Sequence, residues 1–204
     1  MRRQVSFWVT VADLWTRFLL VAVPAACAFA AAVASAAPAD GERWAAVGLI
    51  AGYRTFASPL ELEGEFAIGA RVSLGLSDRV TIMIDGAHAD PTRRTSGKVS
   101  SFGDIRALVS YRLRERGVRP YILAGLGGQI LNFHDAPASA SAIVAAGLGA
   151  EITLSPEWLA IFEGAADFYR GRFVTYSSTG QELSSTNREM YATGIFSAGL
   201  LYRF

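Results

Sequence analysis

The sequence has little of what several classes of protein need. Its 204 residues contain a single cysteine, Cys27, which excludes a disulfide framework and a cysteine-rich metal site. Lys and Arg number 19 against 18 Asp and Glu, so the chain lacks the excess of cations that neutralises a nucleic-acid backbone. Charged residues make up 18% of the chain, against about 25% in a typical soluble domain. These shortages exclude a nucleic-acid partner and direct attention to the 51% of residues that are hydrophobic.

The N-terminal segment has the pattern of an export signal. Three arginines precede a long apolar run that ends in alanine, serine and proline. This order is typical of a secretory signal peptide. We predict cleavage after Ala36 or Ala39, with residues 1–39 as the cleaved signal and 40–204 as the mature domain. Two alternatives stay open, a permanent membrane helix, since about 20 apolar residues span a bilayer, and lipid attachment at Cys27.

From Trp44 onward, apolar residues recur at every second position, which is the period of a β-strand. We predict eight strands, at residues 44–56, 65–76, 79–89, 100–113, 119–132, 141–154, 158–170 and 188–204. Each has ten or more residues, whereas strands of soluble proteins usually have about five or six. A tilted strand needs about 9–11 residues to cross a bilayer. The strand lengths therefore favour a membrane-spanning sheet.

Short and long connections alternate strictly between these strands. The short turns are 77–78, 114–118 and 155–157, and the long polar segments are 57–64, 90–99, 133–140 and 171–187. In an up-and-down barrel, this alternation puts every long loop at one end and both termini at the other. We therefore predict an all-β fold, an eight-stranded antiparallel up-and-down transmembrane β-barrel preceded by the signal peptide.

A faint repeat relates two of the hairpins. LSDRVTIMIDG, from Leu76 to Gly86, matches LSPEWLAIFEG, from Leu154 to Gly164, at an offset of four strands. Both copies place a turn before a strand, and both place an acid, Asp85 or Glu163, on the same face of that strand. We use the match as support for the register of the strands and not as evidence of a duplication.

The two faces of the strands differ in polarity. One face is apolar or aromatic. The other carries the charged side chains Arg54, Arg71, Asp85, Asp104, Arg106, Arg112, Glu151, Glu163, Asp167 and Arg203. A soluble barrel turns its apolar face inward, whereas a membrane barrel turns it toward lipid, and periodicity alone does not separate the two. Aromatic residues near the strand ends favour the membrane, because such rings prefer the headgroup level. They are Tyr53, Phe56, Phe66, Tyr111, Tyr121, Trp158, Phe168, Tyr191 and Tyr202.

The stretches FGDIRALVSYRL, RPYILAGLGG and GLGAEITLSPEW, together with the alternating Leu200, Tyr202 and Phe204 at the C-terminus, carry a resemblance to a known family. Over residues 40–204 the chain resembles the OmpA/OmpX-type family of small outer-membrane β-barrels. The resemblance implies a place in the bacterial outer membrane and contact with its lipid and lipopolysaccharide. It also implies that Leu200, Tyr202 and Phe204 form the signal read by the barrel-assembly machinery. We expect a monomer.

An eight-stranded barrel has a narrow interior that side chains fill. Charges enclosed there persist only when they are paired and hydrogen-bonded. The inward arginines and acids are similar in number, so we predict an ion-pair network that plugs the lumen. Glycines at 125, 127, 128, 147 and 149 are expected to allow close packing of the strands. This interpretation favours a non-enzymatic barrel with a structural or surface-interaction role. A narrow, low-conductance pore is one alternative.

A lipid A-modifying enzyme is the second alternative. The resemblance implies that a deacylase would carry His and Ser two residues apart on a lipid-facing strand. The two histidines, His88 and His134, are followed at that spacing by Asp90 and Ala136. We therefore predict no catalytic site, cofactor or metal.

The second long segment is basic through Arg93, Arg94 and Lys98. It has two interpretations, attraction to lipopolysaccharide phosphates or a solvated loop tip.

Overall fold

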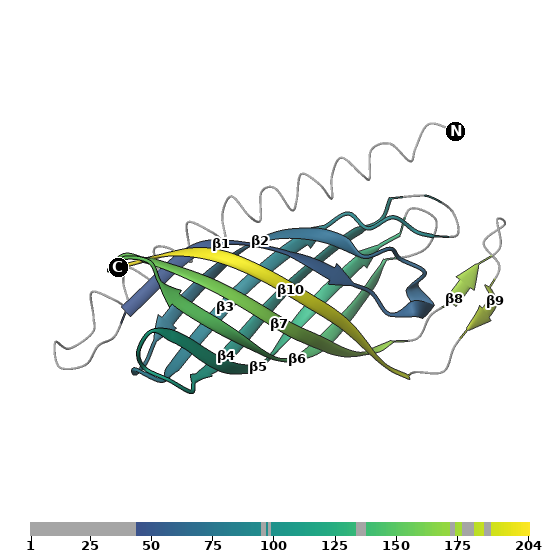
Figure 1. Ribbon diagram of the computed structural model, residues 1–204. Coiled ribbons are helices and arrows are strands. Elements are labelled where there is room, and N and C mark those ends of the chain that lie inside the picture. Colours follow the sequence, from purple (N-terminus) through teal and green to yellow (C-terminus); the bar gives the residue numbers. More distant parts are fainter. Residues whose placement is uncertain are drawn as a thin grey trace.

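The strands of this chain close into one antiparallel barrel (Figure 1). The computed structural model describes residues 44–94, 97, 99–133, 138–171, 174–176, 182–185 and 189–204. The predicted signal peptide, together with Lys98 and His134, lies outside these residues. The barrel strands are β1 (Trp44–Thr55), β2 (Glu65–Gly75), β3 (Val80–Ala89), β4 (Ser101–Arg112), β5 (Val118–Asn132), β6 (Ser139–Thr153), β7 (Trp158–Gly171) and β10 (Glu189–Arg203). The eight predicted strands are confirmed, each to within two residues at either end.

Strands that follow one another in sequence are neighbours in the barrel, and β10 closes the sheet by pairing with β1. The closing ladder runs from Ala46 opposite Arg203 to Thr55 opposite Gly194. At the chain end, the Phe204 amide also donates to the Ala45 carbonyl at 2.8 Å. Closure gives every barrel strand a hydrogen-bonded neighbour on both sides, which a bilayer requires because it offers no water to unpaired backbone groups.

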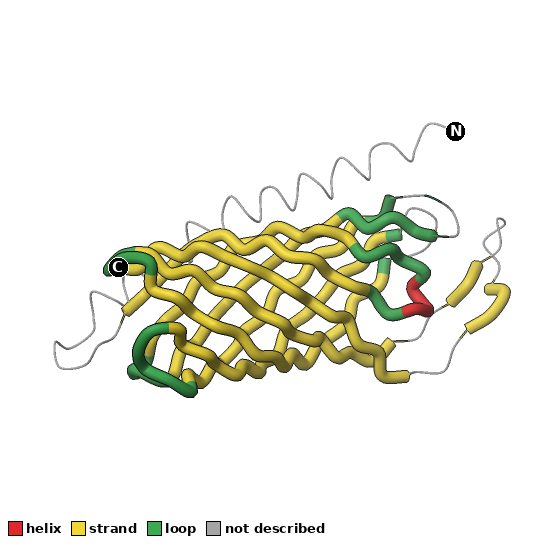
Figure 2. Tube along the Cα trace, in the orientation of Figure 1, coloured by secondary structure: helices red, strands yellow, loops and turns green. Residues whose placement is uncertain are grey.

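The connections lie at the two ends of the barrel, as Figure 2 shows, and the C-terminus lies at the end that carries the short turns. We call this the turn end and the opposite one the loop end. The two turns of the sequence repeat share one hydrogen-bonding pattern. The amides of Leu76 and Ser77 donate to the Val80 carbonyl, as those of Leu154 and Ser155 donate to the Trp158 carbonyl. The repeat thus corresponds to one type of hairpin used twice.

Two features at the loop end depart from the sequence analysis. The last long connection contains a small hairpin, β8 (Val174–Tyr176) and β9 (Glu182–Ser185), where we predicted only a loop. The first contains a single 3₁₀ turn, η1 (Ser58–Leu60). Such short elements lack enough residues to show a period in the sequence.

Within the described residues, no helix is long and apolar enough to cross a membrane.

The outer face of the barrel is apolar. Large hydrophobic side chains alternate outward along the strands, among them Leu49, Ile68, Leu126, Leu148 and Phe196, and each of these five is more than 60% exposed. A soluble barrel would bury such residues, because single exposed apolar side chains are common on a protein surface but a continuous apolar belt is not. The polarity of the two faces is therefore that of a membrane barrel.

Candidate functional site: the charged lumen

The alternation of the strands carries most of the predicted charged residues into the lumen. Nine of the ten have at most 8% of their surface exposed: Arg54, Arg71, Asp85, Asp104, Arg106, Arg112, Glu151, Glu163 and Asp167. Because a strand turns successive side chains to opposite faces, each of these residues has outward-facing neighbours on its own strand. Which charges can pair across the lumen therefore depends on the strand that each one occupies and on its position along the barrel axis.

Arg71, on β2, lies at the centre of this set. Its guanidinium binds Glu163 of β7 through both terminal nitrogens, with Nη1–Oε1 at 2.5 Å and Nη2–Oε2 at 2.8 Å. Nη2 also donates to Asp85 Oδ2 at 2.5 Å on the adjacent strand β3. Glu163 Oε1 accepts a further hydrogen bond from the Tyr121 hydroxyl of β5 at 2.5 Å. Both acids of the sequence repeat thus bind the same arginine.

A second part of the network lies closer to the loop end. Arg54 of β1 donates to Asp104 of β4 at 2.5 Å and to Asp167 of β7 at 3.1 Å. Arg106 of β4 donates to Asp167 at 3.3 Å and, through Nε, to Asp85 at 2.9 Å. Asp85 joins the two parts, because it binds both Arg71 and Arg106.

We call these residues the central network: Arg54, Arg71, Arg106, Asp85, Asp104, Glu163, Asp167 and the Tyr121 hydroxyl. It contains three guanidiniums and four carboxylates, so its formal charge with every group ionised is −1. An enclosed charge without a counter-ion is costly, because the lumen removes most of the water that would solvate it. The network is therefore more tolerant of losing an acid than of losing an arginine.

A smaller cluster, the turn-end triad, consists of Arg112, Arg119 and Glu151. Glu151 Oε2 lies 3.0 Å from Arg112 and its Oε1 lies 2.5 Å from Arg119. Arg112 also packs over the Trp44 ring, with its Cζ 4.8 Å from the ring centroid. Arg119 was not among the predicted inward charges, although its position two residues before the inward-facing Tyr121 puts it on the same face.

Arg203 stands apart from both clusters. It lies at the end of β10, is only partly buried, and its Nε donates to the Pro156 carbonyl of the last turn at 2.8 Å. Its inclusion among the lumen ion pairs was wrong. The alternation is correct for this side chain, but its position at the end of β10 places it at the rim, where it binds a turn carbonyl.

Apolar side chains fill the lumen above and below the charges. At the loop end, Leu60 and Leu62 of the first long loop turn inward and pack in one cluster with Phe102 and Leu131. We call this cluster the loop-end cap; it also contains Ala67, Ala89, Ile143, Tyr169 and Tyr191. Nearer the turn end, Ala46, Ile50, Leu159, Ile161 and Leu201 form another cluster. Large apolar side chains thus share the lumen with the charges, because a narrow interior must be packed as densely as any protein core.

Aromatic side chains form a rim at each end of the outer face. Tyr53 and Phe66 pair near the loop end with their ring centroids 5.6 Å apart. At the turn end, Trp158, Tyr202 and Phe204 form a row with centroid separations of 5.2 and 5.3 Å. These positions agree with rings placed at the two headgroup levels.

Three of the aromatic assignments were wrong. Tyr121 and Tyr191 are buried in the lumen, and Phe56 is partly buried and packs against the loop-end cap, with its ring centroid 5.4 Å from that of Phe102. Nearness to a strand end suggested a rim position for each. For Tyr121 and Tyr191 the alternation of the strand decides instead, and it turns both inward.

At the turn-end rim, Arg79 donates to the Tyr111 hydroxyl at 3.3 Å and to Glu115 at 2.8 Å. These hydrogen bonds raise the pKa of Arg79 above its ordinary value, so the exposed guanidinium stays charged. A fixed cation at this level suits a headgroup region rich in phosphates.

His88 lies on the outward face near the loop end of β3, with Nε2 3.2 Å from Asp90 Oδ1. Both side chains are well exposed. Among the described residues, no group of three or more His, Cys, Asp or Glu is placed to hold a metal ion. His88 and Asp90 therefore form an exposed pair at the loop-end rim.

The basic second loop is joined to the first. The Glu63 amide donates to the Thr92 carbonyl at 2.9 Å, and the Arg94 amide donates to the Glu61 carbonyl at 2.7 Å. The Arg93 guanidinium lies 3.6 Å from Glu61 and over the Phe133 ring, 5.6 Å from its centroid. These contacts join the described parts of the two loops into one surface next to the loop-end cap.

The close approach of neighbouring strands explains part of the glycine content. A Cβ at Gly125 would overlap the backbone of Ala107 and Leu108, and one at Gly127 the Ile105 carbonyl. Gly147 and Gly149 are equally confined, whereas a Cβ at Gly128 would meet only the Ser141 carbonyl oxygen, at 3.9 Å. Four of the five glycines therefore behave as expected, and Gly128 faces open space on the outer wall.

This geometry defines a class of protein: a closed, eight-stranded, all-antiparallel barrel with an apolar outer face. No family model matches the chain, and no curated protein matches it. Among solved structures, it is similar to Neisserial surface protein A at 15% identity and a TM-score of 0.54, over 79% of this chain and 97% of that one. Another similar structure is the N-terminal β-barrel domain of Pseudomonas aeruginosa OprF, at 15% identity and a TM-score of 0.49, over 78% of this chain and 97% of that one.

The likeness to the Neisserial protein extends over nearly the whole of that barrel and establishes the fold. The chain has the fold of the small outer-membrane β-barrels, as the OmpA/OmpX-type resemblance predicted. A barrel with this outer face belongs in a bilayer, and for this fold that bilayer is the bacterial outer membrane.

Proposed function

We propose that the protein is a non-enzymatic outer-membrane barrel that presents its long loops to the outside and does not conduct through its lumen. The observation that carries the proposal is the Arg71–Glu163 pair. It joins β2 to β7, and these strands are separated by β1 and β10 in the barrel. A bidentate pair between strands that are not neighbours lies across the interior and not along its wall.

The loop-end cap supports the same proposal. Leu62 and Phe102 are almost completely buried, and they lie between the central network and the outside. An ion that entered from the loop end would have to displace packed apolar side chains and then part a paired network. Both steps are costly, because the first opens a cavity and the second leaves buried charges unpaired.

The surface formed by the described parts of the first two loops favours a surface-interaction role over a purely structural one. Backbone hydrogen bonds between Glu63 and Thr92 and between Arg94 and Glu61 fix its shape. A fixed surface loses little conformational entropy on binding, which favours recognition of a partner.

Planar-bilayer recording of the refolded barrel tests the closed lumen, with a general porin as the positive control. We expect no reproducible conductance steps. Steady unitary steps from the refolded barrel would instead support the narrow pore.

Mass spectrometry of lipid A from cells with and without the protein tests the absence of enzyme activity, and we expect the same acylation pattern in both. Labelling of single cysteines, placed one at a time in the long loops and in the short turns, on intact cells tests the orientation, and we expect labelling in the loops only. Labelling confined to the turns 77–78, 114–118 and 155–157 would contradict it.

A further inference from the structure

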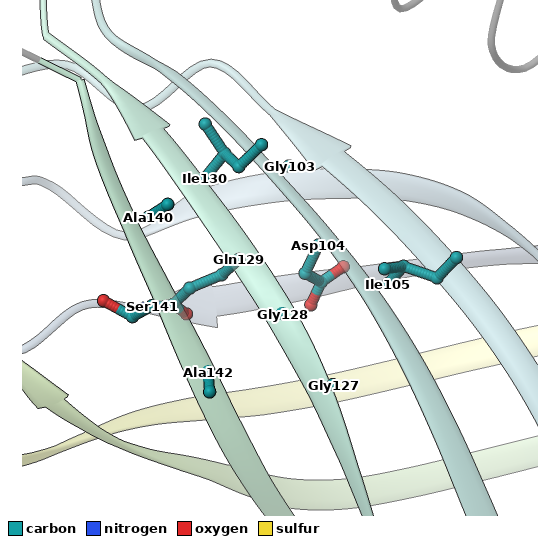
Figure 3. Close-up of a pocket in the computed structure, with 10 residues that line it drawn as sticks. All are labelled: Gly103, Asp104, Ile105, Gly127, Gly128, Gln129, Ile130, Ala140, Ser141 and Ala142. Carbon is teal, nitrogen blue, oxygen red and sulfur yellow. The ribbon is translucent and has the colours of Figure 1, made fainter.

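The outer wall of the barrel is not smooth near the loop end. An open hollow of about 440 Å³ lies over β4, β5 and β6 (Figure 3). On the outward face it is lined by Gly103, Ile105, Gly128, Ile130, Ala140 and Ala142. Asp104 and Gln129 also border it, but both are buried and belong to the inward face.

The register explains why the wall is hollow at this place. Ile105 pairs with Gly128, and Gly128 pairs with Ala142, so one outward row carries a single large side chain followed by two small ones. In the next row, Ile130 lies between Gly103 and Ala140. The two isoleucines form the sides of the hollow, and Gly128 and the alanines form its floor.

The hollow lies at the height of acyl chains. Gly128 is four residues before Asn132, where β5 ends, which is about 14 Å along the strand at roughly 3.4 Å per residue. Barrel strands tilt by about 35–45°, so this corresponds to a depth of about 10 Å along the barrel axis. At this depth below the loop end, the outer wall of the barrel contacts the outer leaflet. The apolar floor and sides therefore face hydrocarbon.

A cation lies beside the hollow, on the next strand of the barrel and opposite Ala142. Ile143 pairs with Tyr169 across β6 and β7, and the next residues along these strands are Ala142 and Arg170. Arg170 is exposed, and it is the residue before Gly171, where β7 ends. A charged side chain on the lipid-facing surface is tolerated at the headgroup level and is costly at the midplane. Arg170 is thus placed to meet a lipid phosphate.

We propose that this hollow is a binding site for lipid A, with one acyl chain on Gly128 and Ala142 and a phosphate at Arg170. An apolar hollow with an arginine on the neighbouring strand is complementary to a lipid that carries both acyl chains and phosphates. Lipid A is the phosphorylated lipid of the outer leaflet in a Gram-negative outer membrane. The site goes beyond the closed-lumen function and shares with it only the orientation of the barrel.

Native mass spectrometry of the refolded, full barrel in detergent tests the proposal. The probes are lipid A with two phosphates, the same lipid A without phosphates, and phosphatidylglycerol. We expect the unsubstituted protein to retain bisphosphorylated lipid A in preference to phosphatidylglycerol. Equal retention of the two would overturn the assignment to lipid A.

Two substitutions separate the two halves of the site. Gly128→Leu fills the hollow and is expected to lower retention of both forms of lipid A about tenfold. Arg170→Gln is expected to lower retention of the phosphorylated form by about tenfold, the effect of one charge-assisted hydrogen bond, and to leave the dephosphorylated form unchanged. Retention at the unsubstituted level in both variants would overturn the proposal.

Gly164→Leu is the matched control. Gly164 also lies on the outward face, a Cβ there would make only ordinary contacts with Phe196, and it lies outside the hollow. Retention in this variant should equal that of the unsubstituted protein; an equal loss in Gly164→Leu and Gly128→Leu would count against a defined site.

Heat-modifiable gel mobility checks the folding of each variant, and Ala142→Leu replaces Gly128→Leu if the latter does not fold. The closed lumen is tested by conductance and the lipid site by lipid retention. Failure of one proposal is therefore distinguishable from failure of the other.

Discussion

Arg71 and Glu163 form a bidentate ion pair that connects two strands on different sides of the barrel. Both terminal nitrogens of the guanidinium are occupied, and Nη2 is shared with Asp85. A planar guanidinium held between two carboxylates has little freedom to rotate, so the pair fixes the distance between the walls as well as their charge. Because Asp85 and Glu163 occupy equivalent places in the two repeated hairpins, both hairpins are tied to this one arginine.

The central network predicts an asymmetry between its acids and its arginines. Asp167→Asn removes the surplus negative charge and leaves Arg54 with Asp104 and Arg106 with Asp85. Arg54→Gln raises the surplus from one negative charge to two. We expect the first substitution to change the free energy of unfolding by less than about 1 kcal/mol and the second to lower it by about 3–5 kcal/mol.

Urea titration of the barrel refolded into lipid vesicles, followed by tryptophan fluorescence, measures both values. Trp44 and Trp158 provide the signal at the turn end. Equal losses in the two variants would show that hydrogen bonds matter more than the charge count.

The orientation of the faces gives a prediction on one strand. Leu126 lies near the middle of β5 and Val118 begins it, and both side chains are exposed on the outward face. Arginine on the lipid face of a barrel costs about 2–4 kcal/mol at the midplane and about 0–1 kcal/mol near the interface. Leu126→Arg should therefore be strongly destabilising in vesicles, with Val118→Arg close to neutral. A water-exposed outer face would make both substitutions neutral, and the same urea titration separates the two cases.

The period-two pattern was sufficient to predict the strands, the alternation of loops and turns, and which charges point inward. Nine of the ten charged positions are buried because alternation is a local property of a strand. The partners of each charge were not predictable. Arg54 reaches Asp104 three strands away, and such pairing depends on the stagger of the closed sheet, which no single segment of sequence encodes.

Height along the barrel was the second property that the sequence did not reveal. Arg203 has the inward alternation of the other charges but lies at the rim. Leu60 and Leu62 come from a segment without period two, so their role in the loop-end cap had no signal in the sequence. The hollow on the outer wall depends on which small residues become neighbours across three strands, and thus on register.

The Tyr121 hydroxyl gives a prediction about hydrogen bonding in the lumen. It donates to Glu163 Oε1 at 2.5 Å, and Tyr121→Phe removes this bond while the ring stays in place. A hydrogen bond to a charged group contributes about 1.5–3 kcal/mol, so the unfolding free energy should fall by that amount. Tyr53→Phe at the outer rim is the control and should change it by less than about 0.5 kcal/mol. Equal effects in a urea titration would show that the Tyr121 hydroxyl contributes nothing beyond its ring.

Two glycines three residues apart on β5 give the last prediction. Gly125 faces the lumen side, where a Cβ would overlap the Ala107 carbonyl and the Leu108 backbone, whereas a Cβ at Gly128 points into the hollow of the outer wall. Gly125→Ala must push β4 and β5 apart, and overpacking of this kind costs about 1–3 kcal/mol. Gly128→Ala adds one methyl group in open space and removes backbone freedom from the unfolded chain, so it should stabilise the barrel by about 0.4–1 kcal/mol. The unfolding free energies in vesicles measure both changes, and a stable Gly125→Ala barrel would mean that β4 and β5 can separate without cost.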